Sequence, residues 1–165
     1  MSEVFVALGS NIDPHARLQS AARLLRSHFP NARFSRCYRN AAVGFEGDDF
    51  VNAVVAFSTD LTVTELLRVL HAIEEQCGRG RADSRWGPRA MDLDLLLYGD
   101  EIGQGPGYVL PRGDMLRRAY MLGPLAELAP EVAHPVARET IGALWRAFPQ
   151  AEHPMTPTSP DLNAA

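Results

Sequence analysis

The chain has 165 residues, of which 46% are hydrophobic and 22% charged, and its net charge is −4. This length supports one domain with a sizeable core, and the mild negative charge disfavours a protein that coats nucleic acid. No window reaches the ~18 apolar residues of a membrane span, and the N-terminus lacks a signal-peptide pattern. The two cysteines, Cys37 and Cys77, have no metal-site spacing and suit a reducing cytoplasm.

The first half of the chain alternates between strand and helix patterns. Residues 3–11, "EVFVALGSN", predict a buried strand, and Asp13 with Pro14 predicts the start of a helix. Residues 32–40, "ARFSRCYRN", predict a second strand, and residues 50–59, "FVNAVVAFST", a third. Thr62 and Glu65 have the spacing of a capping box that opens a second helix, and Gly78 suits the end of that helix.

The second half begins with an arginine-rich loop and a further strand, residues 90–99. Residues 99–107 predict a glycine-rich loop, residues 114–130 a helix interrupted near Gly123 and Pro124, and residues 139–148 a last short helix. The order β-α-β-β-α-β predicts an α+β fold of ferredoxin-like type, with a mixed or antiparallel sheet and helices packed on it. We expect a single domain over residues 1–148 and a disordered, proline-rich tail over residues 149–165.

Two carboxylates, Asp92 and Asp94, interrupt the apolar strand "AMDLDLLLYG". Side chains two apart in a strand share a face, so we expect both acids on one face and Met91, Leu93, Leu95 and Leu97 on the other. Such a pair can hold magnesium, which takes few protein carboxylates and completes its shell with water and phosphate oxygens. The D-x-D pattern alone fits an exposed strand face equally well.

Arginines gather in the loop that leads into this strand: Arg79, Arg81, Arg85 and Arg89. Guanidinium groups bind phosphate oxygens in a bidentate fork, so acids beside arginines suit a magnesium nucleotide. The competing interpretation is a set of surface ion pairs with Asp83 or Glu75. No Walker motif and no kinase glycine loop is present, so any phosphate chemistry uses a different architecture.

The stretch 85–95, "RWGPRAMDLDL", fits R-W-G-P-R-x-[LM]-D-L-D-[LI] at every position and closely resembles the signature of the 6-hydroxymethyl-7,8-dihydropterin pyrophosphokinase family. The resemblance extends over about residues 3–131, through "VALGSN", "YRNAAVGF", "FVNAVVAF", "AIEEQCGR" and "LRRAYMLGPLAELAPE". It implies a ferredoxin-like α+β fold and transfer of pyrophosphate from ATP to the pterin hydroxymethyl group, giving the pterin diphosphate and AMP in folate biosynthesis.

The resemblance also implies roles for individual residues. Asp92 and Asp94 match the carboxylates that hold two Mg²⁺ ions, and Arg79 and Arg89 match catalytic, phosphate-facing arginines. The matches expected to contact the nucleotide, ATP, are His71 (in place of a common glutamine), Glu74, Arg81, Trp86, Arg112 and Arg118. The matches expected to contact the pterin are Asn40, Val43, Gly44, Phe50, Asn52 and Tyr120.

Phe50 and Tyr120 would stack on the pterin ring, with Phe and Tyr exchanged relative to the family, and Asn52 would read it through its amide. Without the resemblance, core packing explains these two rings as well. The family's T-P-P-[LV]-G loop is replaced by residues 40–44, "NAAVG", and Arg112 replaces a histidine that contacts ATP. These departures leave open a divergent paralogue with a modified pterin.

Two other classes of function compete with the enzyme. A non-catalytic module that binds pterin or nucleotide would keep its ligands without turnover. An RNA-binding ferredoxin-like domain would need a basic sheet face with aromatic residues, which Asp92 and Asp94 argue against. We expect a cytoplasmic enzyme with small-molecule partners and no nucleic-acid or membrane partner, acting as a monomer, with oligomers left open.

Overall fold

The computed structural model of the chain is described for residues 1–41, 48–78 and 90–164. Its centre is an antiparallel sheet in which β1 (Ser2–Ser10) lies between β4 (Phe50–Thr59) and β5 (Asp92–Tyr98). On the far side of β4, β3 (Cys37–Asn40) pairs in turn with β8 (Thr156–Thr158), and the short β2 (Arg33–Phe34) also pairs with β4. The sequence predicts one strand over residues 32–40, and the structure divides it into β2 and β3.

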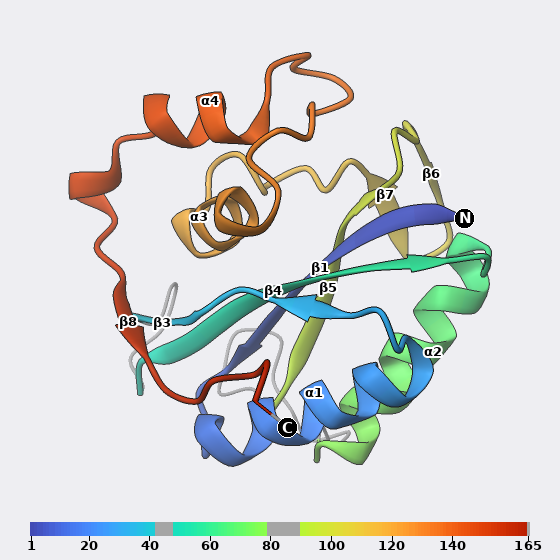
Figure 1. Cartoon of the computed structure of the whole chain (residues 1–165), viewed down its shortest axis with the longest axis vertical. Coiled ribbons are helices and arrows are strands. Elements are labelled where there is room, and N and C mark those ends of the chain that lie inside the picture. The colour runs from blue at the N-terminus through green and yellow to red at the C-terminus, as the bar shows by residue number, and fades with distance from the viewer. Residues whose placement is uncertain (42–47, 79–89, 165) are drawn as a thin grey trace.

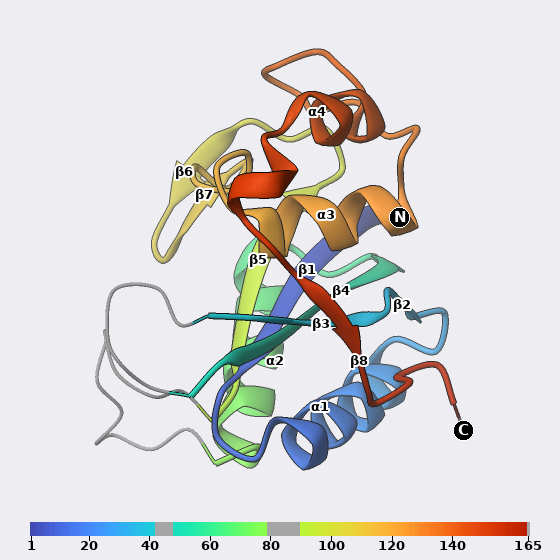
Figure 2. The same ribbon diagram turned by 90° about the vertical axis from the view of Figure 1, so that its left-hand side faces the viewer.

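Helices cover both faces of this sheet (Figures 1 and 2). The helices α1 (Pro14–His28) and α2 (Val63–Gln76) pack on one face, and α3 (Ala119–Leu128) packs on the other with α4 (Ile141–Ala147) above it. The remaining elements are the hairpin of β6 (Gly103–Gly105) and β7 (Tyr108–Leu110) and the 3₁₀ helix η1 (Gln150–Glu152). The predicted α+β fold, with a mainly antiparallel sheet and helices packed on it, is confirmed.

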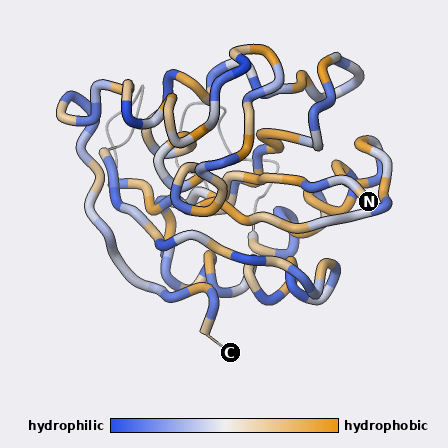
Figure 3. The backbone as a smooth tube through the Cα atoms, turned by 45° about the horizontal axis from the view of Figure 1, so that its top comes forward, coloured by the Kyte–Doolittle hydropathy of each residue, from blue (hydrophilic) through white to orange (hydrophobic). Residues whose placement is uncertain are grey.

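The two faces of β1 explain why this layering forms. Val4, Val6 and Leu8 belong to the core beneath α1 and α2, whereas Phe5 and Ala7 belong to the core beneath α3. A strand with apolar side chains on both faces is stable only when both faces are covered. Figure 3 shows the hydrophobic residues running along the strands in the middle of the molecule.

The acidic strand β5 contains an irregularity that the sequence pattern hides. Val6 pairs with Leu95 and Phe5 with Leu97, so Leu96 is an extra residue in the ladder, as in a β-bulge. As a result Leu93 and Leu95 lie in the core beneath α2, while Leu96 and Leu97 lie in the core beneath α3. The expectation that Leu97 shares a face with Leu93 and Leu95 was therefore wrong.

The helix boundaries agree with the capping signals in most places. The capping box of Thr62 and Glu65 is confirmed, and Gly78 has the positive φ that ends α2. Asp13 is the N-cap of α1 with Pro14 in its first turn, but its side chain makes no capping hydrogen bond. The predicted interrupted helix starts only at Ala119 and is continuous through Pro124. The predicted glycine-rich loop forms part of the hairpin β6–β7.

The prediction of a disordered tail was wrong. Residues after Pro149 form η1 and then β8, which pairs with β3 along the edge of the sheet (Figure 2). The side-chain amide of Asn163 accepts a hydrogen bond from Phe34 N (3.0 Å) and donates one to Phe34 O (2.8 Å), as a neighbouring strand would. Leu162 is only 2% exposed and belongs to the core beneath α1 and α2. Pro157 is tolerated because β8 is an edge strand, which needs no ladder hydrogen bond on its outer side.

Deleting the residues after Met155 tests this packing through the Cys37 thiol, which pairs in register with Thr158. Burial raises the pKa of Cys37 to about 12, with smaller contributions from Asp161 and Glu127, so the reactive thiolate is scarce at pH 8. We expect reaction with a thiol reagent to be at least ~10-fold faster after the deletion, because the thiol gains water and loses its acidic neighbour. Site-resolved mass spectrometry would measure it, with Cys77 on the end of α2 as the internal control. Equal rates at Cys37 in both proteins would contradict the packing.

Candidate active site

Three neighbouring strands place polar side chains in one row. Gly9 on β1 pairs with Asn52 on β4 and with Asp92 on β5, and Ala7 pairs with Asp94. Directly paired residues share a face of an antiparallel sheet, and Ala7 lies in the core beneath α3. Asn52, Asp92 and Asp94 therefore point to the α3 side, where β1 ends and β5 begins. Two strand spacings put Asn52 about 10 Å from Asp92 across the row.

Gly9, in the middle of this row, has no side chain. A Cβ atom there would lie 2.6 Å from Oδ1 of Asn52, so any larger residue would displace the amide. Asn52 is 5% exposed, and its Nδ2 donates a hydrogen bond to Oδ1 of Asn40, the residue that pairs with Phe50. The register confirms that Phe50 and Asn52 lie on one face and adds Asn40 to the same group. These are the residues that the resemblance assigns to the pterin.

Asp92 and Asp94, the expected metal ligands, are each half-buried, and Asp94 lies beside Arg112. A guanidinium nitrogen of Arg112 lies 3.6 Å from Oδ1 of Asp94, and its Nε donates to Oδ1 of Asp114 at 2.8 Å. The backbone N–H of Arg112 also donates to Leu96 O at 3.0 Å, which fixes this segment along the edge of β5. Arg112, expected to contact the nucleotide, thus lies directly beside the aspartate pair.

The first turn of α3 completes the cluster with Arg118 and Tyr120. Arg118 Nε is buried and has no hydrogen-bond partner among the described residues, and it lies 3.9 Å from Oδ2 of Asp114. Burial raises the pKa of the Tyr120 hydroxyl, against the opposing charge of Arg118 and with the support of Asp114 and Asp94. The Tyr120 hydroxyl therefore lies within electrostatic range of Asp94 and Asp114, and it stays neutral at physiological pH. An unsatisfied buried guanidinium nitrogen beside a cavity suits an anionic ligand.

Glu74, expected to contact the nucleotide, lies on α2 and has a described contact with the acidic strand β5. It is only 4% exposed, and its Oε2 accepts a hydrogen bond of 2.8 Å from Leu93 N, between the two aspartates. The described contact is structural, because it joins α2 to β5 and fixes the strand that carries Asp92 and Asp94. His71, one turn earlier on α2, is exposed.

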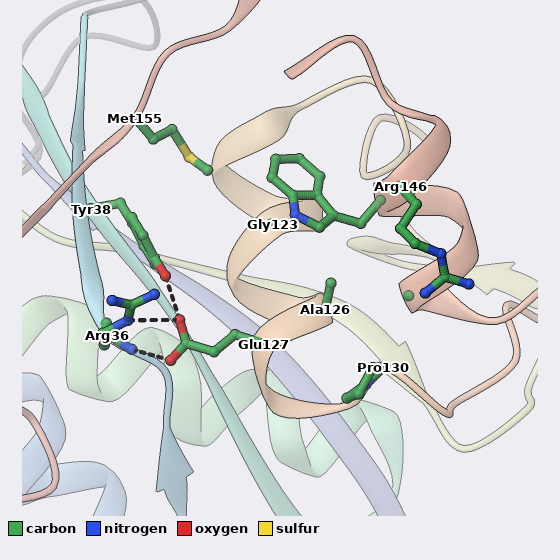
Figure 4. Close-up of a pocket in the computed structure, with 10 residues that line it drawn as sticks. Arg36, Tyr38, Gly123, Ala126, Glu127, Pro130, Arg146 and Met155 are labelled. Carbon is green, nitrogen blue, oxygen red and sulfur yellow. Dashed lines mark hydrogen bonds and ion pairs between the residues drawn. The ribbon is translucent and has the colours of Figure 1, made fainter. Parts of the chain in front are cut away.

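A hydrogen-bond cluster that the sequence did not reveal holds α3 on the sheet (Figure 4). The Glu127 carboxylate on α3 accepts from Arg36 N (2.8 Å), from Arg36 Nε (3.3 Å) and from the Tyr38 hydroxyl. Burial and the bond to Glu127 raise the pKa of Tyr38, so the hydroxyl remains a donor. The cluster lies beside a cavity of about 310 Å³. It fixes α3, and hence the position of Tyr120 relative to β3.

Six of the predicted residues lie outside the described residues. They are Val43 and Gly44 of the expected pterin loop and Arg79, Arg81, Trp86 and Arg89 of the arginine loop. Among the described residues the structure brings together Asn40, Asn52, Phe50, Asp92, Asp94, Arg112, Arg118 and Tyr120. Phe50, Asp92 and Asp94 also have interactions with other residues of the chain.

The described carboxylates suit a metal ion that takes few protein ligands. Among the described residues, no group of three or more His, Cys, Asp or Glu side chains could hold an ion as a protein cage. Two aspartates on one strand face are instead the small carboxylate set that Mg²⁺ accepts when water and phosphate oxygens complete its shell. The residues therefore fit magnesium that arrives with a phosphate-bearing ligand.

Comparison with protein families matches residues 5–130 to "7,8-dihydro-6-hydroxymethylpterin-pyrophosphokinase (HPPK)". The chain belongs to this family. The aspartate pair and the row Asn52–Gly9–Asp92 lie within the matched region. The protein is a pyrophosphokinase, an enzyme that transfers a pyrophosphoryl group from ATP to hydroxymethyldihydropterin in folate biosynthesis.

Curated relatives carry the name 2-amino-4-hydroxy-6-hydroxymethyldihydropteridine pyrophosphokinase. The one from Pseudomonas aeruginosa is 40% identical over 143 residues, covering 84% of this chain and 87% of the relative. The one from Haemophilus influenzae is 36% identical over 166 residues, covering 97% of this chain and 100% of the relative. This high mutual coverage means that the resemblance extends beyond a short motif.

Solved structures support the fold. The HPPK-DHPS of Plasmodium falciparum, solved with pteroate, matches 88% of this chain with a TM-score of 0.71 and 14% identity. A second structure of the Plasmodium falciparum protein, solved with SDX-DHP, matches 89% of the present chain with a TM-score of 0.67 and 15% identity. This chain spans only 42% and 43% of those two chains. In the described part of this protein, no helix is long and apolar enough to cross a membrane.

Replacing Glu74 tests its structural role. Glu74→Ala should lower the free energy of unfolding by about 1–3 kcal/mol, because the buried Leu93 N–H loses its acceptor. Glu74→Gln should lose less, since the amide oxygen still accepts this bond. Urea unfolding followed by circular dichroism measures both, with Glu75→Ala on the exposed side of α2 as the control. An unchanged unfolding free energy with a raised KM for ATP would show instead that Glu74 serves the nucleotide.

Proposed function

We propose that this chain makes 6-hydroxymethyl-7,8-dihydropterin diphosphate and AMP with Asp92 and Asp94 as ligands of two Mg²⁺ ions. The observation that carries the proposal is the row in which Gly9 separates the Asn52 amide from Asp92. It separates the Asn52 amide, which we assign to a flat heteroaromatic ring, from the carboxylate pair by about 10 Å. Asp92 and Asp94 would hold magnesium there, which would supply positive charge to offset the charge of the triphosphate.

The pterin side consists of Phe50, Asn52 and Tyr120. We assign Phe50 and Tyr120 to the two faces of the ring and the Asn52 amide to its hydrogen-bonding edge. The bond from Asn52 to Asn40 supports this, because an amide held by a neighbour is oriented before the ligand arrives. Val43 and Gly44 are proposed for the rim of the same pocket.

The phosphate side is assigned to arginines. Arg112 contacts Asp94 directly and Arg118 is joined to Arg112 through Asp114. Arg79, Arg81 and Arg89 with Trp86, all of the arginine loop, are proposed to bind the triphosphate. His71 and Glu74 complete the proposed nucleotide set, although the described contact of Glu74 is with β5. In the free protein Arg112 balances Asp94. With Asp94 holding a metal ion, the Arg112 guanidinium would be free to donate hydrogen bonds to phosphate.

No Ser-His-Asp arrangement is needed for this reaction. The hydroxymethyl oxygen attacks the β-phosphorus, the bond from that phosphorus to the α-phosphate oxygen breaks, and AMP leaves. The chain's own contribution is to align the two substrates and surround the phosphates with fixed positive charge. We place this reaction in the cytoplasm and assign it to a monomer, with a modified pterin as the second candidate because residues 40–44 depart from the family loop.

Removing one carboxylate separates an enzyme from a binding module. Asp94→Asn should reduce pterin-dependent AMP formation from Mg-ATP by at least ~100-fold, because it removes a charged metal ligand from the site of phosphoryl transfer. Chromatographic measurement of AMP with and without the pterin gives the rate. Asp100→Asn, an exposed acid just after β5, is the matched control. A parent chain that binds both ligands but forms no AMP would refute the enzyme and favour the binding module.

Substitutions at Arg112 test its phosphate contact. Arg112→Ala should raise the KM for ATP about 10-fold with little change in the KM for the pterin, since a charge-assisted hydrogen bond to phosphate is lost. Arg112→His should recover most of this loss by supplying another phosphate donor. Steady-state kinetics measure both, with Arg33→Ala on the exposed β2 strand as the charge control. An unchanged KM for ATP in Arg112→Ala would assign Arg112 to the Asp114 ion pair alone.

A further inference from the structure

A cavity of about 220 Å³ lies at the start of α3. It is lined by three segments that are distant in sequence: Asn40 and Ala41 after β3, residues 117–120 at the start of α3, and residues 152–155 from the C-terminal segment. Asn40 and Tyr120 belong to the proposed pterin residues and Arg118 to the proposed nucleotide residues. The cavity therefore lies where the two proposed substrates meet, and one of its walls comes from the C-terminal segment.

This wall is held firmly from both ends. Met155 packs against Gly123 of α3, where an added Cβ would lie 2.8 Å from Met155 Cε and 3.0 Å from the Trp145 ring. Beyond Met155 the chain enters β8, which pairs with β3. Before it, the His153 ring lies 5.3 Å from the Phe148 ring, measured between centroids. Gly123 thus makes room for Met155, and residues 152–155 have a defined path across the cavity.

The chemistry of the wall suits a flat heteroaromatic ligand. Pro154 and Met155 present apolar surface, while Glu152 and His153 present a carboxylate and an imidazole. Across the cavity lie the Tyr120 ring and the Arg118 guanidinium, whose Nε has no hydrogen-bond partner among the described residues. The volume is below the usual range for a whole drug-sized ligand, so the cavity suits part of a bicyclic ring.

We propose that residues 152–155 form an outer wall of the substrate site and set the affinity for the pterin. This inference rests on the proposed function, because it takes Asn40 and Tyr120 as pterin residues. The segment lies beyond residues 5–130, which match the family, so the wall is a feature that the family match does not describe. His153 and Pro154 would determine specificity through direct contact with the ring rather than take part in phosphoryl transfer.

The test removes the exposed part of the wall with the double substitution His153→Ala and Pro154→Ala. We expect the KM for 6-hydroxymethyl-7,8-dihydropterin to rise about 5-fold to 10-fold, because apolar contact with the ring is lost. The kcat and the KM for ATP should stay within about 2-fold of the parent values, since neither residue contacts phosphate. Thr156→Ala, an exposed position on β8 outside the cavity, is the control. Thermal unfolding of each variant checks that the fold is kept.

A binding measurement makes the test independent of turnover. The dissociation constant of the pterin, measured by calorimetry with Mg²⁺ and a non-hydrolysable ATP analogue, should rise by the same factor in the double variant only. If the parent is active and the double substitution changes neither the KM nor the dissociation constant of the pterin, residues 152–155 do not contact the pterin. If the parent is inactive but the double variant binds pterin more weakly, the proposed function is refuted and the contact with residues 152–155 stands. A parent that binds no pterin would overturn both.

Discussion

The structure depends on the double pairing of β1. This strand pairs with β4 over its full length and with β5 over most of it, and its side chains enter both hydrophobic cores. Because β1 fixes the register of its two neighbours, it also fixes which residues meet at its end. Gly9 stands between Asn52 and Asp92 for that reason alone, and a one-residue slip of either pairing would turn one of these side chains to the α1 and α2 face.

Charges near the site balance one another in a chain of alternating sign. Asp94, Arg112, Asp114 and Arg118 follow one another at ion-pair distances of 3.6, 2.8 and 3.9 Å. Partly exposed pairs of this kind add little to stability, so their arrangement matters more for ligand binding than for folding. In the free protein these ion pairs balance the charges of the site. When an anionic nucleotide and its cations bind, the arginines can exchange aspartate for phosphate and the aspartates can exchange arginine for a cation.

The sequence predicted the layers and the shared face of Asp92 and Asp94 because both follow from local patterns, whereas the other candidate site residues came from the family resemblance. The apolar run of residues 4–8 and the capping box at Thr62 are each visible in a single segment, and the spacing of Asp92 and Asp94 puts them on one face. The extra residue Leu96 could not be predicted, because a run of three leucines is equally compatible with a regular strand and with a bulged one. The role of Glu74 depends on a partner 19 positions away, Leu93 N, and β8 gains its order only from β3. The proline content of the C-terminal segment led to a prediction of disorder, but an edge strand tolerates proline.

The position of β8 has a consequence for how a new chain folds during synthesis. All the other described strands are synthesised before β8, which closes the edge formed by β3. Until then β3 presents unpaired backbone groups, and Cys37 lacks the cover that buries it. The nascent protein therefore carries an open sheet edge for the whole time that α3 and α4 are being made. The segment after Leu128 therefore matters during synthesis as well as in the finished enzyme. Once β8 has formed, the edge of β3 can no longer pair with another molecule.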